Sequence, residues 1–343
     1  AAQGRAKSGM RRSALDGVPI SWKDLFDTAG VTTEAGSALL KGRVPEQDAY
    51  VLANATEAGL VCLGKTHMSE LAYSGLGYNP VTDTPPNIND HGAAPGGSSS
   101  GAAASVAFGL AAAGIGSDTG GSVRLPSTWN DLVGLKTVSG RLSLQGVVPL
   151  AARFDTVGPL CRSVEDTALL LAAMEPCVVP DLSDCSLRGA RLMILNTLAL
   201  DNLEDAPRAA FESAVDRLKA AGAEVIEGDC PEVAEAFASS GALLSTEAYG
   251  TWRDEIEAQP ELMFHEVRER FRTGRAFSGA DYVAAWQRLD VLRAAYAEKT
   301  AEFDAVILPG SPILPPDVAR LATDSDLSLI HISEPTRLES KSR

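Results

Sequence analysis

The sequence predicts an α/β fold, and three observations support this class. Short apolar segments alternate with amphipathic helical patterns along the chain, as in proteins built on a sheet covered by helices. The composition, with 45% hydrophobic and 22% charged residues among 343, is typical of a globular protein. The 31 glycines follow no repeat, which excludes fibrous and low-complexity proteins.

The clearest unit lies in the second half of the chain. An apolar strand is predicted over 191–195, an amphipathic helix over 205–221 and a second strand over 223–226. Pro207 lies in the first turn of that helix, where its missing N–H is harmless, and Gly222 lies just beyond the helix end. These signals together predict a βαβ element.

Two further helices are predicted over 260–272 and 281–303, followed by a strand over 305–308. The longer helix carries apolar residues at helical spacing, which predicts one buried face. The residues of this face are Val283, Trp286, Leu289 and Leu292.

Charge and cysteine content restrict the partners and the compartment. A net charge of −15 argues against direct nucleic-acid binding, which needs a clustered positive surface. The five cysteines are widely spaced and form no C-x-x-C pair, so we expect reduced thiols and a cytoplasmic protein. No apolar run of about 18 residues is present, so no membrane association is expected. The cysteines are Cys62, Cys161, Cys177, Cys185 and Cys230.

The C-terminal string LSLIHISEPTR, residues 327–337, resembles the in-frame translation of a sequencing adapter. We therefore interpret 327–343 as a non-native tail and exclude it from the fold. The alternative is a genuine amphipathic tail, but the segment shows no helical periodicity.

Several common motifs are matched only in part or lie in an unsuitable sequence context, so we reject the functions that they would indicate. Residues 59–66, GLVCLGKT, match a P-loop formally, but the apolar run over 60–63 predicts a buried strand instead of a phosphate-binding turn. His265 begins an H-E sequence without the second histidine of a zinc site. Only three histidines, His67, His91 and His265, precede residue 327, so a Ser-His-Asp triad has little support.

The segment 95–126 is dominated by Gly, Ala and Ser, which predicts a site built from closely packed backbone. Ser122 follows two glycines, on a turn suited to a nucleophile beside free amides. Ser98 follows the other glycine pair and is placed to relay a proton. Lys23 lies in an apolar segment, and a lysine that loses its charge on burial can activate a serine.

Five segments together resemble the amidase signature family: GVPISWKD, TTEAGS, PGGSSSG, GSDTGGSVRLPS and VGLKT. The similarity is nearly continuous over residues 15–166. It implies an amidase-signature fold with a central mixed, twisted sheet covered by helices on both faces. It also implies a single domain over 1–326 that is incomplete at both ends, so that the chain is a fragment.

The resemblance assigns the catalytic roles by motif position. It makes Ser122 the acyl nucleophile, Ser98 the serine on a cis peptide bond and Lys23 the terminal base of a Ser-cisSer-Lys triad. It implies an oxyanion hole from the amides of Thr119, Gly120, Gly121 and Ser122, with Asp118 and Arg124 supporting the loop.

The pocket is less well defined by the motifs. This chain departs from the family pattern over 127–131 and at Thr137, near the nucleophile. Four residues are inferred from family position to line the pocket, and each is equally well explained as a packing residue. They are Ala72, Tyr73, Ser74 and Trp129.

The implied reaction is hydrolysis of a small-molecule amide through an acyl-enzyme on serine, with no metal and no cofactor. Oligomeric state is open, and a homodimer is one alternative. Two other functions remain open as well: the glutaminase subunit of a tRNA-dependent amidotransferase, and an inactive fragment. The segment 74–90 looks more like the stand-alone amidases than like that subunit.

Overall fold

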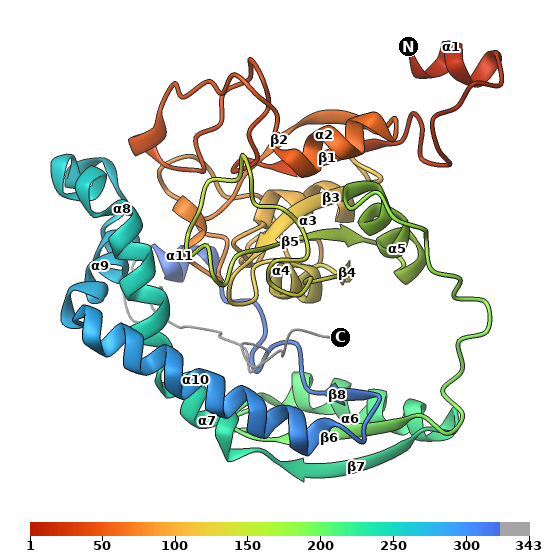
Figure 1. Ribbon diagram of the computed structural model, residues 1–343, viewed down its shortest axis with the longest axis vertical. Coiled ribbons are helices and arrows are strands. Elements are labelled where there is room, and N and C mark those ends of the chain that lie inside the picture. Colours follow the sequence, from red (N-terminus) through yellow and green to blue (C-terminus); the bar gives the residue numbers. More distant parts are fainter. Residues whose placement is uncertain (323–343) are drawn as a thin grey trace. The chain divides into compact units, whose positions relative to one another are not determined.

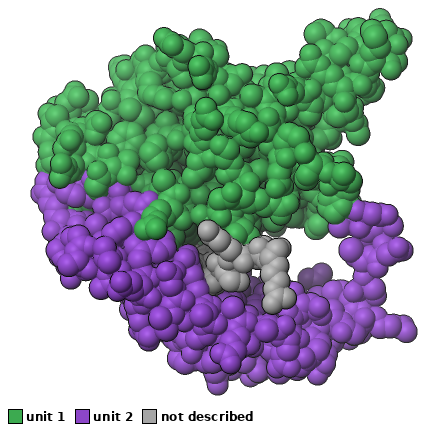
Figure 2. All heavy atoms as spheres, in the orientation of Figure 1, with its two compact units in different colours: residues 1–180, 250–272, 315–331 green, residues 181–249, 273–314, 332–343 purple. Residues whose placement is uncertain are grey.

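The computed structural model describes residues 1–322, and the chain divides into two compact units, shown separately coloured in Figure 2. Unit 1 holds residues 1–180 and 250–272 and continues from 315, whereas unit 2 holds 181–249 and 273–314. The single domain expected over 1–326 stays a prediction. The tail proposed over 327–343 lies outside the described residues.

Unit 1 contains a five-stranded mixed sheet in the order β2-β1-β3-β5-β4 (Figure 1). Strand β1 runs parallel to both β2 and β3, whereas β5 is antiparallel to β3 and β4. The strands are β1 (Pro19–Lys23), β2 (Val61–Thr66), β3 (Ala113–Asp118), β4 (Val133–Gly134) and β5 (Thr156–Cys161).

Helices flank this sheet, which confirms the predicted α/β class with a central mixed sheet. Helix α3 packs against β1, β2, β3 and β5, whereas α5 packs against β5 and β4 and also contacts α2. The α-helices that lie wholly in unit 1 are α1 (Ala2–Lys7), α2 (Tyr50–Glu57), α3 (Ser100–Ala107), α4 (Arg124–Trp129), α5 (Val164–Met174), α9 (His265–Arg272) and α11 (Val318–Leu321).

Small residues allow α3 to approach β3 closely. Every residue of β3 is buried, and its sequence AGIGSD contains no large side chain except Ile115. A Cβ atom added at Gly114 would lie 2.8 Å from the Ala102 carbonyl oxygen. The close contact between α3 and β3 therefore depends on the glycine. Ser99, just before α3, donates its Oγ–H to the Ser117 carbonyl near the end of β3 at 3.2 Å, so the start of α3 lies beside the end of β3.

Unit 2 contains a three-stranded parallel sheet in the order β7-β6-β8. The βαβ element predicted from the sequence is confirmed as β6, α6 and β7, and Gly222 has a φ of 97° beyond the end of α6. The elements are β6 (Arg191–Asn196), α6 (Asp205–Ala220), β7 (Glu224–Asp229), α7 (Pro231–Ala238), α10 (Gly279–Thr300) and β8 (Ala305–Ile307), and α8 (Thr246–Ala258) connects to unit 1.

The strand expected to be buried over 60–63 is present but exposed. Val61 and Leu63 are 40% and 53% exposed, because β2 lies at the edge of the sheet of unit 1. Periodicity alone does not distinguish an edge strand from a central one, so the prediction of burial was wrong.

The two predicted C-terminal helices also differ in detail. The segment 260–272 forms a 3₁₀ turn, Pro260–Leu262, followed by α9. Helix α10 begins with a capping box between Ser278 and Asp281 and buries Leu289 and Leu292 as expected. Val283 is exposed and Trp286 only half-buried, which corrects the predicted buried face.

Within residues 1–322, no helix combines the length and the apolarity needed to cross a membrane.

Candidate active site

The end of β1 places a lysine inside the sheet of unit 1. Lys23 is the last residue of β1, between β2 and β3, and is fully buried. Its Nζ donates to Ser98 Oγ at 2.7 Å and to Ser117 Oγ at 2.8 Å. Nζ also donates to the Ser117 carbonyl at 3.4 Å, so among residues 1–322 its hydrogen-bond partners are two hydroxyls and one carbonyl, with no carboxylate.

Burial determines the protonation of this lysine. It lowers the pKa of Lys23 to about 7, although the nearby carboxylates of Asp118 and Asp155 favour the charged form and act in the opposite direction. A substantial fraction of Lys23 is therefore neutral near neutral pH, and a neutral amine can accept a proton.

The glycine turn before α3 presents Ser98 to this amine. The peptide bond between Gly97 and Ser98 is cis, and the Ser98 carbonyl accepts from the Ser69 N–H at 3.2 Å. A Cβ atom at Gly97 would lie 2.5 Å from the Gly77 nitrogen and 2.7 Å from Ser69 Oγ. Only glycine fits here without displacing backbone.

Ser122 lies on the loop that follows β3, beside the same turn. The Ser99 N–H donates to the Ser122 carbonyl at 3.1 Å, which holds the two serine-containing segments side by side. Ser122 is 8% exposed, whereas Ser98 and Lys23 are fully buried. Among these three residues, Ser122 is therefore the one with an accessible surface.

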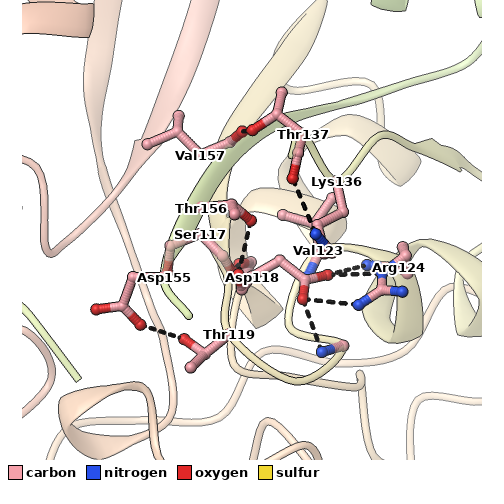
Figure 3. A network of polar contacts seen from close by, with 12 residues as sticks. Ser117, Asp118, Thr119, Val123, Arg124, Lys136, Thr137, Asp155, Thr156 and Val157 are labelled. Atoms are coloured by element: carbon pink, nitrogen blue, oxygen red, sulfur yellow. Dashed lines mark hydrogen bonds and ion pairs between the residues drawn. The ribbon is translucent and has the colours of Figure 1, made fainter. Parts of the chain in front are cut away.

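Asp118 shapes the loop that carries Ser122 (Figure 3). Its carboxylate accepts from the N–H groups of Gly121 at 2.7 Å and Val123 at 3.1 Å. Arg124 adds a two-pronged ion pair, with Nε and Nη2 each 3.0 Å from the carboxylate. The expected support of the loop by Asp118 and Arg124 thus has a direct geometric basis.

Asp118 remains ionised despite its burial. Burial alone would raise the pKa of Asp118, but the charge and hydrogen bonds of Arg124 and the Val123 N–H hold it below its usual range. Of the four amides predicted for the oxyanion hole, that of Gly121 already donates to this carboxylate. The role of the Thr119, Gly120 and Ser122 amides in an oxyanion hole stays a prediction.

The model of the family described as Amidase matches residues 1–338. The chain belongs to the amidase family. It is 33% identical over 322 residues to 2-amino-5-chloromuconic acid deaminase of Comamonas testosteroni, covering 92% of this chain and 70% of that protein. It is 39% identical over 244 residues to a glutamyl-tRNA(Gln) amidotransferase subunit of Anaeromyxobacter dehalogenans (strain 2CP-C), covering 67% of this chain. That alignment spans only half the length of the relative.

The fold of the amidase family is shared as well. A crystal structure described as that of an amidase superposes with a TM-score of 0.87 at 31% identity, covering 98% of this chain and 78% of that chain. The expected fold class and family are thereby confirmed.

Two residues that contact the site were missed by the reasoning from sequence. Ser117 Oγ, like Ser98 Oγ, accepts a hydrogen bond from Lys23 Nζ. Asp155 accepts a hydrogen bond from Thr119 Oγ1 at 2.5 Å. Asp155 lies just before β5, far from the motifs in sequence, and nothing in its local sequence indicates a role. Ser117 directly precedes Asp118 at the end of β3, a position that could have drawn attention to it.

The side chains of the four expected pocket residues are mostly buried in unit 1. Ala72, Tyr73 and Trp129 are each no more than 5% exposed, and Ser74 is half-buried. The Tyr73 ring meets Phe271 edge to face at a centroid distance of 4.7 Å. Their assignment to a substrate pocket stays a prediction.

The departures from the family pattern form internal contacts. Asn130 Nδ2 donates to the Pro95 carbonyl at 2.7 Å and to the Pro126 carbonyl at 2.8 Å, which joins α4 to the glycine turn. Thr137 Oγ1 donates to the Val157 carbonyl at 2.9 Å (Figure 3). Both side chains therefore stabilise the surroundings of the nucleophile loop.

Proposed function

We propose that this chain carries the catalytic site of an amidase that hydrolyses a small-molecule carboxylic amide to an acid and ammonia or an amine. The observation that carries the proposal is the bond from buried Lys23 Nζ to Ser98 Oγ, with Ser122 on the adjacent loop. A neutral lysine that acts through a serine relay can activate a serine nucleophile, the role that histidine has in other serine hydrolases.

In the first step, Ser122 Oγ attacks the carbonyl carbon of the amide. The Ser122 proton passes to Ser98 while the Ser98 proton passes to neutral Lys23, which becomes an ammonium group. The amides of Thr119, Gly120 and Ser122 stabilise the oxyanion. The carbon–nitrogen bond then breaks, and the leaving nitrogen takes the proton back from Lys23 through Ser98.

In the second step, water attacks the ester formed on Ser122. The same relay draws a proton from the water, and it returns that proton to Ser122 Oγ when the ester bond breaks. The carboxylic acid is released and Lys23 is neutral again. Every proton transfer therefore uses the pair formed by Lys23 and Ser98.

The test is intact-mass labelling of the chain with a fluorophosphonate, which traps an activated serine. We expect a single adduct that is lost in Ser122→Ala, and a labelling rate in Lys23→Ala reduced about a hundredfold or more. Ser105→Ala is the control, because Ser105 Oγ pairs with Ser21 Oγ at 2.8 Å outside the triad. A folded parent chain that takes up no label would contradict the proposal and favour the inactive fragment.

A second candidate is the glutaminase subunit of a tRNA-dependent amidotransferase. The 39% identity to a protein named as such a subunit favours it. Ammonia release separates the two candidates: a stand-alone amidase hydrolyses simple amides without a partner, whereas the subunit releases ammonia from glutamine and responds to its partner and tRNA. Aliphatic, aryl and dicarboxylic-acid amides form the first substrate panel.

The cellular compartment, the absence of nucleic-acid binding and the oligomeric state are also proposals. The five cysteines are unpaired, which supports a reducing, cytoplasmic setting. The net charge of −15 supports the absence of direct nucleic-acid binding. A homodimer is a further proposal, and sedimentation of the purified chain tests it.

A further inference from the structure

Asp155 is a buried carboxylate that the proposed mechanism does not use. It is 5% exposed and accepts three hydrogen bonds. Oδ1 accepts from Thr119 Oγ1 at 2.5 Å, and Oδ2 accepts from the N–H groups of Leu150 at 2.9 Å and Ala151 at 3.1 Å. Both oxygens are thus occupied by protein donors, and the carboxylate connects the loop before β5 to the loop of Ser122.

Strand register explains why Asp155 and Thr119 meet. Asp118 pairs with Thr156 at the end of the antiparallel ladder between β3 and β5, and Thr156 Oγ1 donates to the Asp118 carbonyl at 2.7 Å. The residues one step beyond this pair, Thr119 and Asp155, therefore leave the sheet side by side (Figure 3).

The loop of Ser122 is consequently held at two points. Asp155 binds the side chain of Thr119 at its beginning, and Asp118 binds the backbone of Gly121 and Val123 further along. Donors aimed at an oxyanion act through their fixed geometry, so the position of Thr119 bears directly on the proposed oxyanion hole.

Charge gives Asp155 a second connection to the site. Asp118 is ionised and paired with Arg124, whereas Asp155 has no ion pair within residues 1–322. The negative charges of Asp118 and, to a smaller extent, Asp155 raise the pKa of Lys23 against the larger effect of burial, and burial also raises the pKa of Asp155 itself. On the other sides of Lys23, helix α3 carries no charged residue, and Asp24 is paired with Lys65 at 3.0 Å.

We propose that Asp155 is a positioning residue of the acyl-transfer site: it fixes the Thr119 end of the oxyanion loop and stabilises the protonated form of Lys23 during turnover. The expected effect of Asp155 on the reaction rate rests on the proposed function. The proposed electrostatic effect on Lys23 belongs to the folded chain and does not depend on catalysis.

The first experiment measures Lys23 directly, without activity. The chain is labelled with ¹³C-lysine, the Lys23 signal is assigned by its loss in Lys23→Met, and the resonance is titrated by NMR in the parent and in Asp155→Asn. Removing the negative charge should lower the titration midpoint of Lys23. An unchanged midpoint in a folded variant would overturn the electrostatic half of the proposal.

The second experiment measures fluorophosphonate labelling against pH. Thr119→Val removes the hydroxyl and keeps the shape, so it should lower the maximal rate about tenfold without moving the midpoint. Asp155→Asn should lower both the maximal rate and the midpoint. The double variant should lose no more maximal rate than Asp155→Asn alone, because the two groups act through one bond. A folded Thr119→Val chain with the parent rate would overturn the positioning role, even if Asp155→Asn fails to fold.

Asp16→Asn is the matched control, because Asp16 is also a buried carboxylate of unit 1 but pairs with Arg5 near the N-terminus. It should lower the melting temperature and leave the pH midpoint unchanged. Equal midpoints in all variants, with only stability lost, would make Asp155 a structural residue. A parent that fails to label, while the NMR midpoint still moves in Asp155→Asn, would overturn the proposed function and support the electrostatic effect.

Discussion

Burial changes the protonation of Lys23 and thereby the chemistry that its amine can perform. A lysine in water has a pKa near 10.4 and is charged at neutral pH, so it cannot accept a proton. Inside the sheet of unit 1 the same amine contacts two serine hydroxyls and its pKa falls to about 7. The low-dielectric surroundings therefore produce the base, and the two hydroxyls orient it.

The protonation of Lys23 predicts a pH dependence. The neutral form is the active one, so labelling of Ser122 should be slow below the pKa, rise through about pH 7 and level off above it. Lys23→Arg keeps a permanent positive charge and should remain unreactive throughout. The measurement is the labelling rate at a series of pH values, corrected for reagent hydrolysis without protein. A rate independent of pH between about pH 5 and pH 9 would disprove the role of Lys23.

At the scale of the elements, helix α3 is positioned by very close backbone contacts. Helix α3 lies against β3 and the end of β2, and Gly101 in its first turn is in contact with the backbone of His67. The Gly101 N–H also donates to the His67 carbonyl at 2.9 Å. This contact places the start of α3, and with it Ser98, relative to Lys23 at the end of β1.

A pair of helix glycines tests this contact. A Cβ atom at Gly101 would lie 2.5 Å from the His67 nitrogen, whereas one at Gly250 in α8 would meet nothing within 4 Å. Gly101→Ala should therefore destabilise the chain by about 1–3 kcal/mol. Gly250→Ala should stabilise it by about 0.5–1 kcal/mol, because alanine favours the helix. Denaturant unfolding measures both, and changes of equal sign would refute the explanation.

At the scale of the whole molecule, residues distant in sequence join one unit. All the proposed catalytic residues lie in the part of unit 1 before residue 180, yet α9, around residue 265, belongs to that unit too. Glu70 connects these parts: it accepts from Ser37 Oγ at 2.7 Å and from the Phe264 N–H at 2.9 Å. Burial raises the pKa of Glu70 to about 7, although these hydrogen bonds oppose the shift.

Glu70 predicts how stability depends on pH. Its pKa in the unfolded chain is near 4.3, so between that value and about 7 the folded chain binds more protons and its stability falls as pH rises. The stabilising contribution is complete below the unfolded pKa and is lost through pH 7. Glu70→Gln cannot ionise, so its melting temperature should exceed that of the parent increasingly from about pH 5 to pH 8. A constant difference between the two melting curves would disprove the assignment.

Much of the fold could be predicted from residues close together in the sequence. Pro207 and Gly222 bound a helix because their backbone preferences act locally, and the helix forms where they indicate. The glycines before Ser98 predicted close backbone packing for the same reason, and the added-Cβ contacts at Gly96 and Gly97 show it. The motifs also sufficed to identify the family, which the comparisons confirm.

Only the tertiary structure decided which distant residues meet. The exposure of β2 depends on its place in the strand order, and the contact of Asp155 with Thr119 depends on the register between β3 and β5. The pairing of β1 with β3 likewise sets Ser117 beside Lys23 Nζ. The sequence by itself determined the elements and the reactive groups, because these follow from local preference and residue type. Pairing, burial and pKa depend on groups far apart in the chain, so they exist only once it is folded.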